Sequence, residues 1–180
     1  MENDTAKGNR GWKALFSKKV ILAVLGIAVI IGVGTGAYLV KASDNPEFCS
    51  SCHLMQPYYD SYHDSVLLAN QHAEADLVCH DCHESSIAIQ AEEGIKFVTG
   101  NYQVPLEKRE FSRDFCLECH DDFDSAVKTA TKFEDSNPHD SHNGEMECNV
   151  CHNMHQTSRV MCADCHIFGW FDELDESWAD

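Results

Sequence analysis

Basic residues are scarce in this 180-residue chain, which has 13 Lys and Arg against 30 Asp and Glu and a formal net charge of −17. Beyond Ala42 the shortage is greater, with 7 basic residues against 28 acidic ones. Such a segment repels nucleic acid and anionic membrane surfaces, so neither is expected as a partner. The acidic surface is expected either to aid solubility alone or to steer the segment toward a basic partner surface.

The chain also lacks any cysteine outside one repeated pattern. Its 10 cysteines form five CxxC pairs, and histidine follows each pair at once. A zinc site or a redox dithiol does not need histidine at that position, whereas c-type haem attachment does. In that chemistry the two thiols add to the vinyl groups of one porphyrin, and the histidine is held beneath the iron as a ligand. The alternative is a zinc-ribbon or disulfide-rich protein, and five uniform motifs without other cysteines argue against it.

The pattern predicts five covalently bound haem c groups, which we number in chain order. The attaching cysteines are Cys49 and Cys52, Cys79 and Cys82, Cys116 and Cys119, Cys148 and Cys151, and Cys162 and Cys165. The histidines that complete these motifs, and that are expected to bind the irons, are His53, His83, His120, His152 and His166.

Each iron has a second axial position, and the chain has nearly enough residues to fill all of them. The candidates outside the motif ends are Met55, His63, His72, His139, His142 and His155, because His80 lies inside a CxxC loop and points poorly toward its own iron. Irons with two protein ligands suit electron transfer, whereas a catalytic haem keeps one position open. The number of candidates therefore favours electron transfer, although the sequence does not assign most of them to particular haems. His155 is expected to serve a haem other than haem 4, and Met55 would raise the potential of haem 1 relative to a second imidazole.

A charge-free run, "VILAVLGIAVIIGVGTGAYLV", occupies residues 20–40. As a helix it would span about 31 Å, which matches the hydrocarbon core of a bilayer. A cleaved signal peptide has a shorter apolar region of about 7 to 15 residues. A retained transmembrane anchor is therefore favoured, although the residues at 40–42 loosely resemble a cleavage site.

The charges before this run predict its orientation. Five basic residues precede it, against only Glu2 and Asp4: Lys7, Arg10, Lys13, Lys18 and Lys19. The positive-inside rule places residues 1–19 in the cytoplasm and residues 42–180 outside, in the periplasm or at the cell exterior. That side suits haem attachment. Gly32 and Gly36 form a GxxxG pattern, which either pairs helices in a homo-oligomer or is only a tolerated run of small residues.

Residues 42–180 provide roughly 28 residues for each haem, too few to bury a conventional core as well. The expected fold is therefore mostly α-helical with extensive loops, and the haems form the core of the extracytoplasmic domain. Apolar residues at 87, 91, 95 and 98 predict one amphipathic helix that ends before Pro105. Its apolar face is expected to pack on a haem or another helix, or alternatively to lie against the membrane beside a quinol pocket. The tail "IFGWFDELDESWAD" either caps a porphyrin or docks a partner.

The stretches "FCSSCHLMQP" and "CHDCH" give roughly residues 10–120 a resemblance to the membrane-bound quinol dehydrogenases of the NapC/NirT/NrfH family. The resemblance implies menaquinol oxidation near haem 1 and onward transfer to a soluble reductase. In the family's nitrite-reductase branch the methionine binds haem 1 in place of the motif histidine, so the roles of Met55 and His53 stay open. Two quinol-pocket residues of the family, a lysine and an aspartate, correspond here to Gln90 and Phe97, with Lys96 the only basic residue in that segment.

The C-terminal stretch "NPHDSHNGEMECNVCHNMHQTSRVMCADCHIF" resembles the haem domain of flavocytochrome fumarate reductases and related small tetrahaem cytochromes. Comparable histidines to His139, His142 and His155 ligate neighbouring haems there. Because no flavin domain follows in this chain, the resemblance implies a separate flavoprotein reductase as partner. The expected function is an electron relay from quinol to that reductase. The alternatives are a nitrite or hydroxylamine reductase with an open-site haem, and a storage or sensor cytochrome without quinol activity.

Overall fold

The computed structural model describes residues 17–83 and 86–179. Of the predicted cytoplasmic segment, residues 1–16 lie outside these ranges. The chain divides into two compact units between Asn45 and Pro46.

The described part of the first unit is one long helix, α2 (Lys18–Ala42). The Ser17 side chain caps its start by accepting a hydrogen bond from the backbone N–H of Val20. At the other end, the backbone N–H of Ser43 donates to the carbonyl of Leu39. The helix buries none of its residues and is long and apolar enough to cross a membrane. It fits the predicted anchor and extends two residues beyond the apolar run at each end.

The second unit is built from short helices, turns and loops. Its α-helices are α3 (Pro46–Ser50), α4 (Gln56–His63), α5 (Leu68–Glu74), α6 (Cys79–Cys82), α7 (Ile87–Thr99), α8 (Arg113–Leu117) and α9 (Lys128–Ala130). A π-helical turn, η1 (Phe123–Val127), and three 3-10 turns, η2 (Cys148–Val150), η3 (Met161–Asp164) and η4 (Gly169–Glu173), complete the unit. The described residues form no β-strand, only an isolated bridge between Ser158 and Trp178. The predicted fold class, mostly helical with extensive loops, is confirmed.

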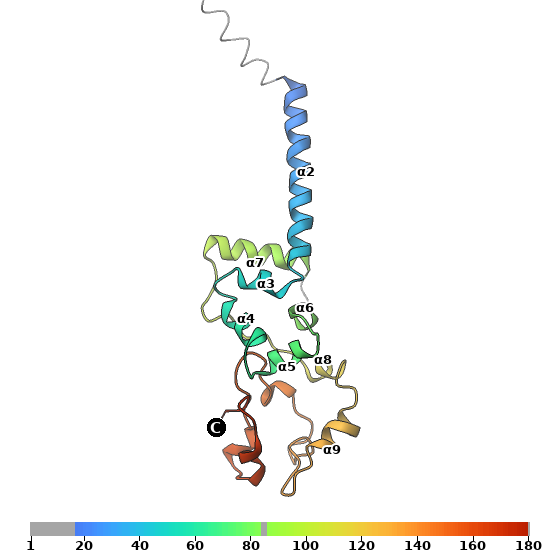
Figure 1. The fold of residues 1–180 in the computed structure, drawn as a ribbon, viewed down its shortest axis with the longest axis vertical. Coiled ribbons are helices and arrows are strands. Elements are labelled where there is room, and N and C mark those ends of the chain that lie inside the picture. Colours follow the sequence, from blue (N-terminus) through green and yellow to red (C-terminus); the bar gives the residue numbers. More distant parts are fainter. Residues whose placement is uncertain (1–16, 84–85, 180) are drawn as a thin grey trace, which may run out of the picture. The chain divides into compact units, whose positions relative to one another are not determined.

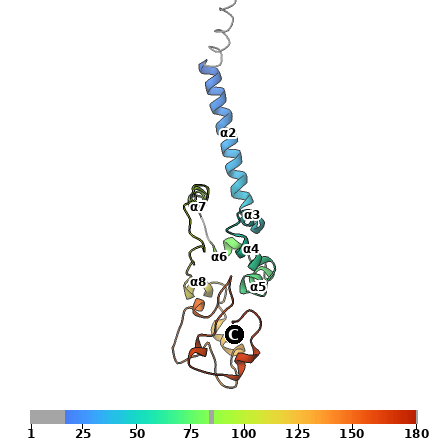
Figure 2. The ribbon, with the colours of Figure 1, turned by 90° about the vertical axis from the view of Figure 1, so that its left-hand side faces the viewer.

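Neighbouring helices of the second unit contact one another, and a few contacts join segments that are far apart in the chain. Helix α4 contacts α3 and α5 (Figure 1), and η2 contacts α8 (Figure 2). The backbone N–H of Ala69 in α5 donates to the carbonyl of Met154, at 2.9 Å. The loop that follows the fourth haem motif therefore returns to the first part of the unit.

Few apolar side chains are buried in the described part of the chain. Only Ala69, Val160 and Trp170 fall below a tenth of their full exposure. Burying such a side chain stabilises a fold by about 1.5 to 3 kcal/mol. Fixing the backbone of one residue costs about 1 to 2 kcal/mol, so these three cannot offset the ordering of the whole unit. The polypeptide requires another large apolar component in its interior, as the haem prediction supposes.

Helix α7 confirms the amphipathic helix predicted from the apolar spacing. The Ser86 side chain caps its start, and Gly100, with φ of 71°, ends it in the left-handed conformation that glycine adopts readily. Its apolar residues Ile87, Ile95 and Val98 are 65%, 64% and 84% exposed. Among the described residues of the second unit no helix covers this face, and its packing on a haem or against the membrane stays a prediction.

Candidate haem-binding sites

The second to fifth CxxCH motifs each close into one tight turn. In these motifs the backbone N–H of the histidine donates to the carbonyl of the first cysteine, at 2.8 to 3.0 Å. All ten cysteines are free, so none is withdrawn into a disulfide. Each turn therefore presents two thiols and one imidazole within five residues. Motif 1 continues differently, because Met55 N–H donates to the carbonyl of Cys52 at 2.8 Å and α4 begins directly afterwards.

Four of the motif histidines lie opposite a second histidine from elsewhere in the chain. The ring centres of His83 and His155 are 6.1 Å apart, and those of His120 and His72 are 6.2 Å apart. The pair His152 and His139 and the pair His166 and His142 are each separated by 6.0 Å. The structure thus brings together four motif histidines and four of the candidate second ligands.

The spacing of these rings fits a haem iron between them. A metal–nitrogen bond of about 2 Å on each side, plus about 1.1 Å from each ring nitrogen to its ring centre, gives a separation of about 6 Å. Directly stacked rings would lie closer together. The four pairs therefore fit haems with two imidazole ligands.

Hydrogen bonds orient three of the second histidines. Nδ1 of His155 lies 2.7 Å from the hydroxyl of Ser61, Nδ1 of His139 lies 2.9 Å from the hydroxyl of Thr131, and Nδ1 of His72 lies 2.8 Å from the carbonyl of Leu68. Ligating histidines commonly donate their other ring N–H in this way. Because these bonds occupy Nδ1, Nε2 is left for an iron.

The electrostatic surroundings keep several of these imidazoles neutral, which is the form that binds a metal. Burial, with smaller effects of the nearby His139 and His120, lowers the pKa of His152 to about 4. Burial also lowers the pKa of His83, with added effects of Arg109, His155 and His80. The pKa of His155 is lowered by burial alone. These rings are therefore uncharged at neutral pH.

A cavity of about 480 Å³ lies at the fifth motif. Its lining includes both attaching cysteines, both histidines of the pair and two aromatic side chains: Cys162, Cys165, His142, His166, Phe168 and Trp170. The Phe168 ring stacks on His166 with centres 5.2 Å apart, and the Trp170 indole N–H donates to Ser136 at 2.9 Å. This set of residues fits the fifth haem, and part of the C-terminal tail lines its site.

Cysteine contacts place the motifs next to one another in chain order. Cys79 hydrogen bonds to Cys49 and lowers the pKa of the Cys49 thiol to about 7. Burial, then Asp81 and Cys119, raise the pKa of Cys82. Burial and the adjacent Cys148 raise the pKa of Cys116 to about 11, and burial and Cys151 raise that of Cys162. The thiols of each motif therefore lie close enough to those of the next motif to influence their pKa values.

The first motif has a different environment. The nearest aromatic partner of His53 is Phe97 of α7, at 5.8 Å between ring centres, and Phe97 stacks on Tyr102 at 5.9 Å. His63 stacks on Tyr59 at 5.3 Å, and in the described part of the chain no second histidine ring faces His53. Met55 is half-buried at the start of α4. The geometry therefore sets motif 1 apart from the other four motifs.

Some residues that serve these sites carry no signal in the sequence. Ser61 and Thr131 orient distal histidines, and Ser61 lies 94 positions away from His155 along the chain. The bond from His72 to Leu68 spans one helical turn and could have been found from spacing alone. No three His, Cys, Asp or Glu side chains of residues 17–83 and 86–179 are placed to hold a metal ion by themselves.

Motif turns, facing imidazoles and a sparse apolar interior together define a multihaem c-type cytochrome. The chain belongs to the cytochrome c3 family, which residues 71–167 match. The cytochrome c-type protein Cgr1 of Eggerthella lenta is 30% identical over 86% of this chain and 85% of its own length. TorC of Escherichia coli K12 is 36% identical over 40% of this chain and 20% of its own length. The acrylate reductase cytochrome subunit of Shewanella woodyi is 42% identical over 29% of this chain and 49% of its own length.

These relatives confirm the predicted resemblance to NapC/NirT-type cytochromes and to the haem domains of reductases. No solved structure matches the chain. Motif 1 and α2 lie outside the residues that match the cytochrome c3 family.

Proposed function

We propose that this protein is a membrane-anchored pentahaem cytochrome that takes electrons from the menaquinol pool and relays them to an extracytoplasmic reductase. The observation that carries the proposal is the set of four histidine pairs, each of which joins a haem motif to a histidine from another part of the chain at the separation that an iron between them requires. When bound, each haem supplies a one-electron Fe(III)/Fe(II) couple. Neighbouring attachment points keep successive haems close enough for electrons to pass between them.

Four haems in this proposal have two histidine ligands. His83 and His155 hold haem 2, His120 and His72 hold haem 3, His152 and His139 hold haem 4, and His166 and His142 hold haem 5. Side chains then fill both axial positions, which leaves no open site for a substrate. This arrangement favours a relay over a nitrite or hydroxylamine reductase.

Quinol oxidation belongs at haem 1 in the proposal. Phe97 contacts His53, and α7, which carries both Phe97 and Gln90, exposes an apolar face suited to a lipid surface. Met55 and His63 are the remaining candidates for the second ligand of haem 1. The proposal includes the alternative in which Met55 binds haem 1 in place of the motif histidine His53. The helix α2 would cross the membrane with its N-terminus in the cytoplasm. Its Gly32 and Gly36 would support a homo-oligomer.

The receiving reductase would meet the other end of the relay, at haem 5. Relatives named as a reductase cytochrome subunit and as a probable fumarate reductase support a reductase partner. The resemblance of the C-terminal stretch to flavocytochrome domains implies that this reductase is a flavoprotein. The acidic excess of residues 43–180 suits a partner with a basic surface.

Two measurements test the proposal. The mass of the purified protein should exceed that of the polypeptide by five haems, and a smaller excess would contradict the pentahaem assignment. In membranes, a menaquinol analogue should reduce the protein, whereas failure of reduction while dithionite still reduces all haems would exclude the quinol step.

A pair of variants locates the entry point for electrons. Phe97→Ala should slow reduction by the quinol analogue and leave reduction by dithionite unchanged, because Phe97 contacts His53. Ile167→Ala is the control, since this fully exposed side chain lies beside the fifth motif. Equal rates in the two variants would contradict entry at haem 1. A dominant high-spin signal that shifts with nitrite would instead favour the reductase alternative.

A further inference from the structure

Two cations meet one aromatic ring beside the fourth haem site. The guanidinium carbon of Arg113 lies 4.4 Å from the ring centre of Phe123, and Nζ of Lys128 lies 5.9 Å from it. The Phe123 ring in turn contacts His139 edge-on, with ring centres 5.4 Å apart. His139 faces His152 in nearly parallel orientation, at an angle of 2°. Two positive charges therefore lie one ring away from this histidine pair.

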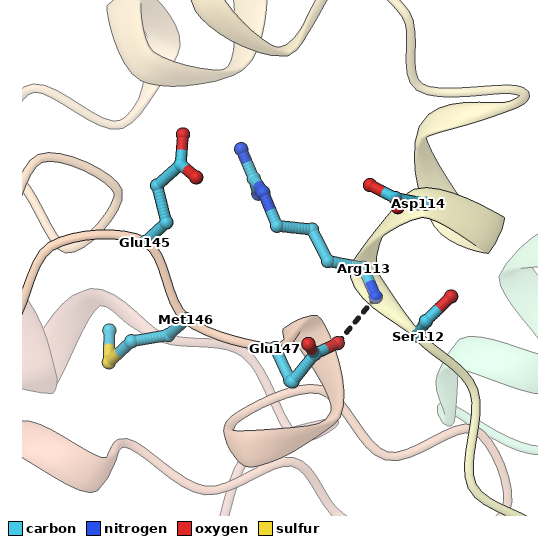
Figure 3. A pocket seen from close by; sticks show the side chains of 6 residues that line it. All are labelled: Ser112, Arg113, Asp114, Glu145, Met146 and Glu147. Carbon is cyan, nitrogen blue, oxygen red and sulfur yellow. Dashed lines mark hydrogen bonds between the residues drawn. The ribbon is translucent and has the colours of Figure 1, made fainter.

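Arg113 is held in place by its backbone rather than by an ion pair. Its N–H donates to the Glu147 carboxylate, and its side chain extends away from that carboxylate (Figure 3). In the described residues no carboxylate lies within ion-pair distance of the guanidinium. Lys128 differs, because it forms an ion pair with Asp124 at 3.2 Å. Asp114, Glu145 and Glu147 line the same pocket as Arg113, but none of them forms an ion pair with it, so its charge is less compensated than that of Lys128.

We propose that Arg113, with Lys128 as a weaker contributor, raises the reduction potential of haem 4. Reduction adds one electron to the iron, from Fe(III) to Fe(II), and lowers the net charge of the site by one. A fixed cation nearby favours the more negative, reduced form. Phe123, His139 and His152 are all at least partly shielded from solvent, so water and salt screen this field less than at an open surface. Arg113 and Lys128 are positioning residues in this account, since they act through the field at the iron and ligate nothing.

The consequence concerns where electrons rest in the relay. The histidines at the ends of the third and fifth motifs, His120 and His166, are exposed, whereas His152 is half-buried. Enclosure and nearby cations both favour Fe(II), and both act at haem 4. In this account an electron would rest longer at haem 4 than it would without the two cations.

The test is a potentiometric titration of the purified, fully haem-loaded protein, in which dithionite supplies the electrons. Arg113→Gln should shift one of the five waves to lower potential, Lys128→Gln should shift the same wave by less, and Arg113→Lys should restore most of the loss. His139→Met identifies the wave of haem 4, because a thioether ligand moves it upward. Lys96→Gln removes an equal charge from α7, beside the first motif, and should leave the haem 4 wave in place.

The inference rests on the proposed ligation of haem 4, and the experiment separates the two. A haem content below five in the parent protein, measured from its mass, would refute the pentahaem relay itself. Five waves, with the haem 4 wave unmoved by Arg113→Gln, would refute only the role of Arg113. A uniform shift of all five waves would also refute it, since that result reflects overall charge rather than a local field.

Discussion

A single hydroxyl provides a sharp test of the haem 2 assignment. Ser61 is 6% exposed, and its Oγ donates to the carbonyl of Tyr58 at 2.7 Å. The hydroxyl has one proton, so at its 2.7 Å contact with His155 it accepts from Nδ1–H. That bond places the free lone pair of His155 on Nε2, where it can bind iron opposite His83.

Removal of this acceptor should raise the potential of one haem. A hydrogen bond accepted from Nδ1–H makes the imidazole a better electron donor, which stabilises Fe(III). The net contribution of such a bond is about 1 kcal/mol. A one-electron couple shifts by about 59 mV for each 1.4 kcal/mol, so Ser61→Ala should raise one potential by at most about 40 mV.

The assay is a potentiometric titration of the fully loaded protein, read from its visible spectrum. Ser65→Ala is the matched control, because the Ser65 hydroxyl donates only to the carbonyl of Ser61 and touches no histidine. Ser61→Thr keeps the hydroxyl and should retain the parent potential. If Ser61→Ala leaves every wave in place, or lowers one, the assignment of His155 as a ligand through Nε2 is wrong.

Three further predictions follow from the ring geometry and the interior. His155→Ala should convert one haem of five to a high-spin form that binds carbon monoxide. His80→Ala is the control and should leave all haems low-spin. Unchanged spectra in both variants would contradict the pairing of His155 with His83. Electron paramagnetic resonance should show rhombic low-spin signals from the two histidine pairs whose rings are nearly parallel, at 2° and 22°. The pairs at 81° and 64° should give strongly anisotropic signals, because parallel imidazoles split the iron dπ orbitals and crossed ones do not. Signals of only one kind would count against these pairings. Trp170→Ala should lower the free energy of unfolding by about 3 to 5 kcal/mol, since Trp170 is buried and stacks on Phe133 at 4.9 Å. Denaturant titration measures this loss, with Ile167→Ala as the control. A loss no larger than that of the control would show that the tail does not stabilise the fold.

The sequence predicted the features that depend only on residues close together in the chain. Five CxxCH motifs predict haem attachment because covalent chemistry fixes their spacing, and the apolar period of residues 87–98 predicts α7 because a helix repeats its faces regularly. The candidate second ligands were predicted as a group, but their pairing with particular motif histidines was not predictable. His83 and His155 meet only because the loop after the fourth motif folds back onto α5, through the bond between Ala69 and Met154.

Two expectations stay predictions. In the described part of the second unit no helix covers the apolar face of α7, whose residues Ile87, Ile95 and Val98 are exposed. His63, a predicted ligand, lies against Tyr59 rather than opposite another histidine, since both residues lie on α4, one turn apart. Its role as a ligand stays a prediction, as does that of Met55.

The distant pairing of His83 with His155 has a consequence for how the protein is made. If the chain is exported in order and His155 ligates haem 2, as proposed, the second motif would leave the cytoplasm long before its second ligand. The site of haem 2 would then be completed only by the last third of the chain, and a product truncated before residue 155 would lack that ligand.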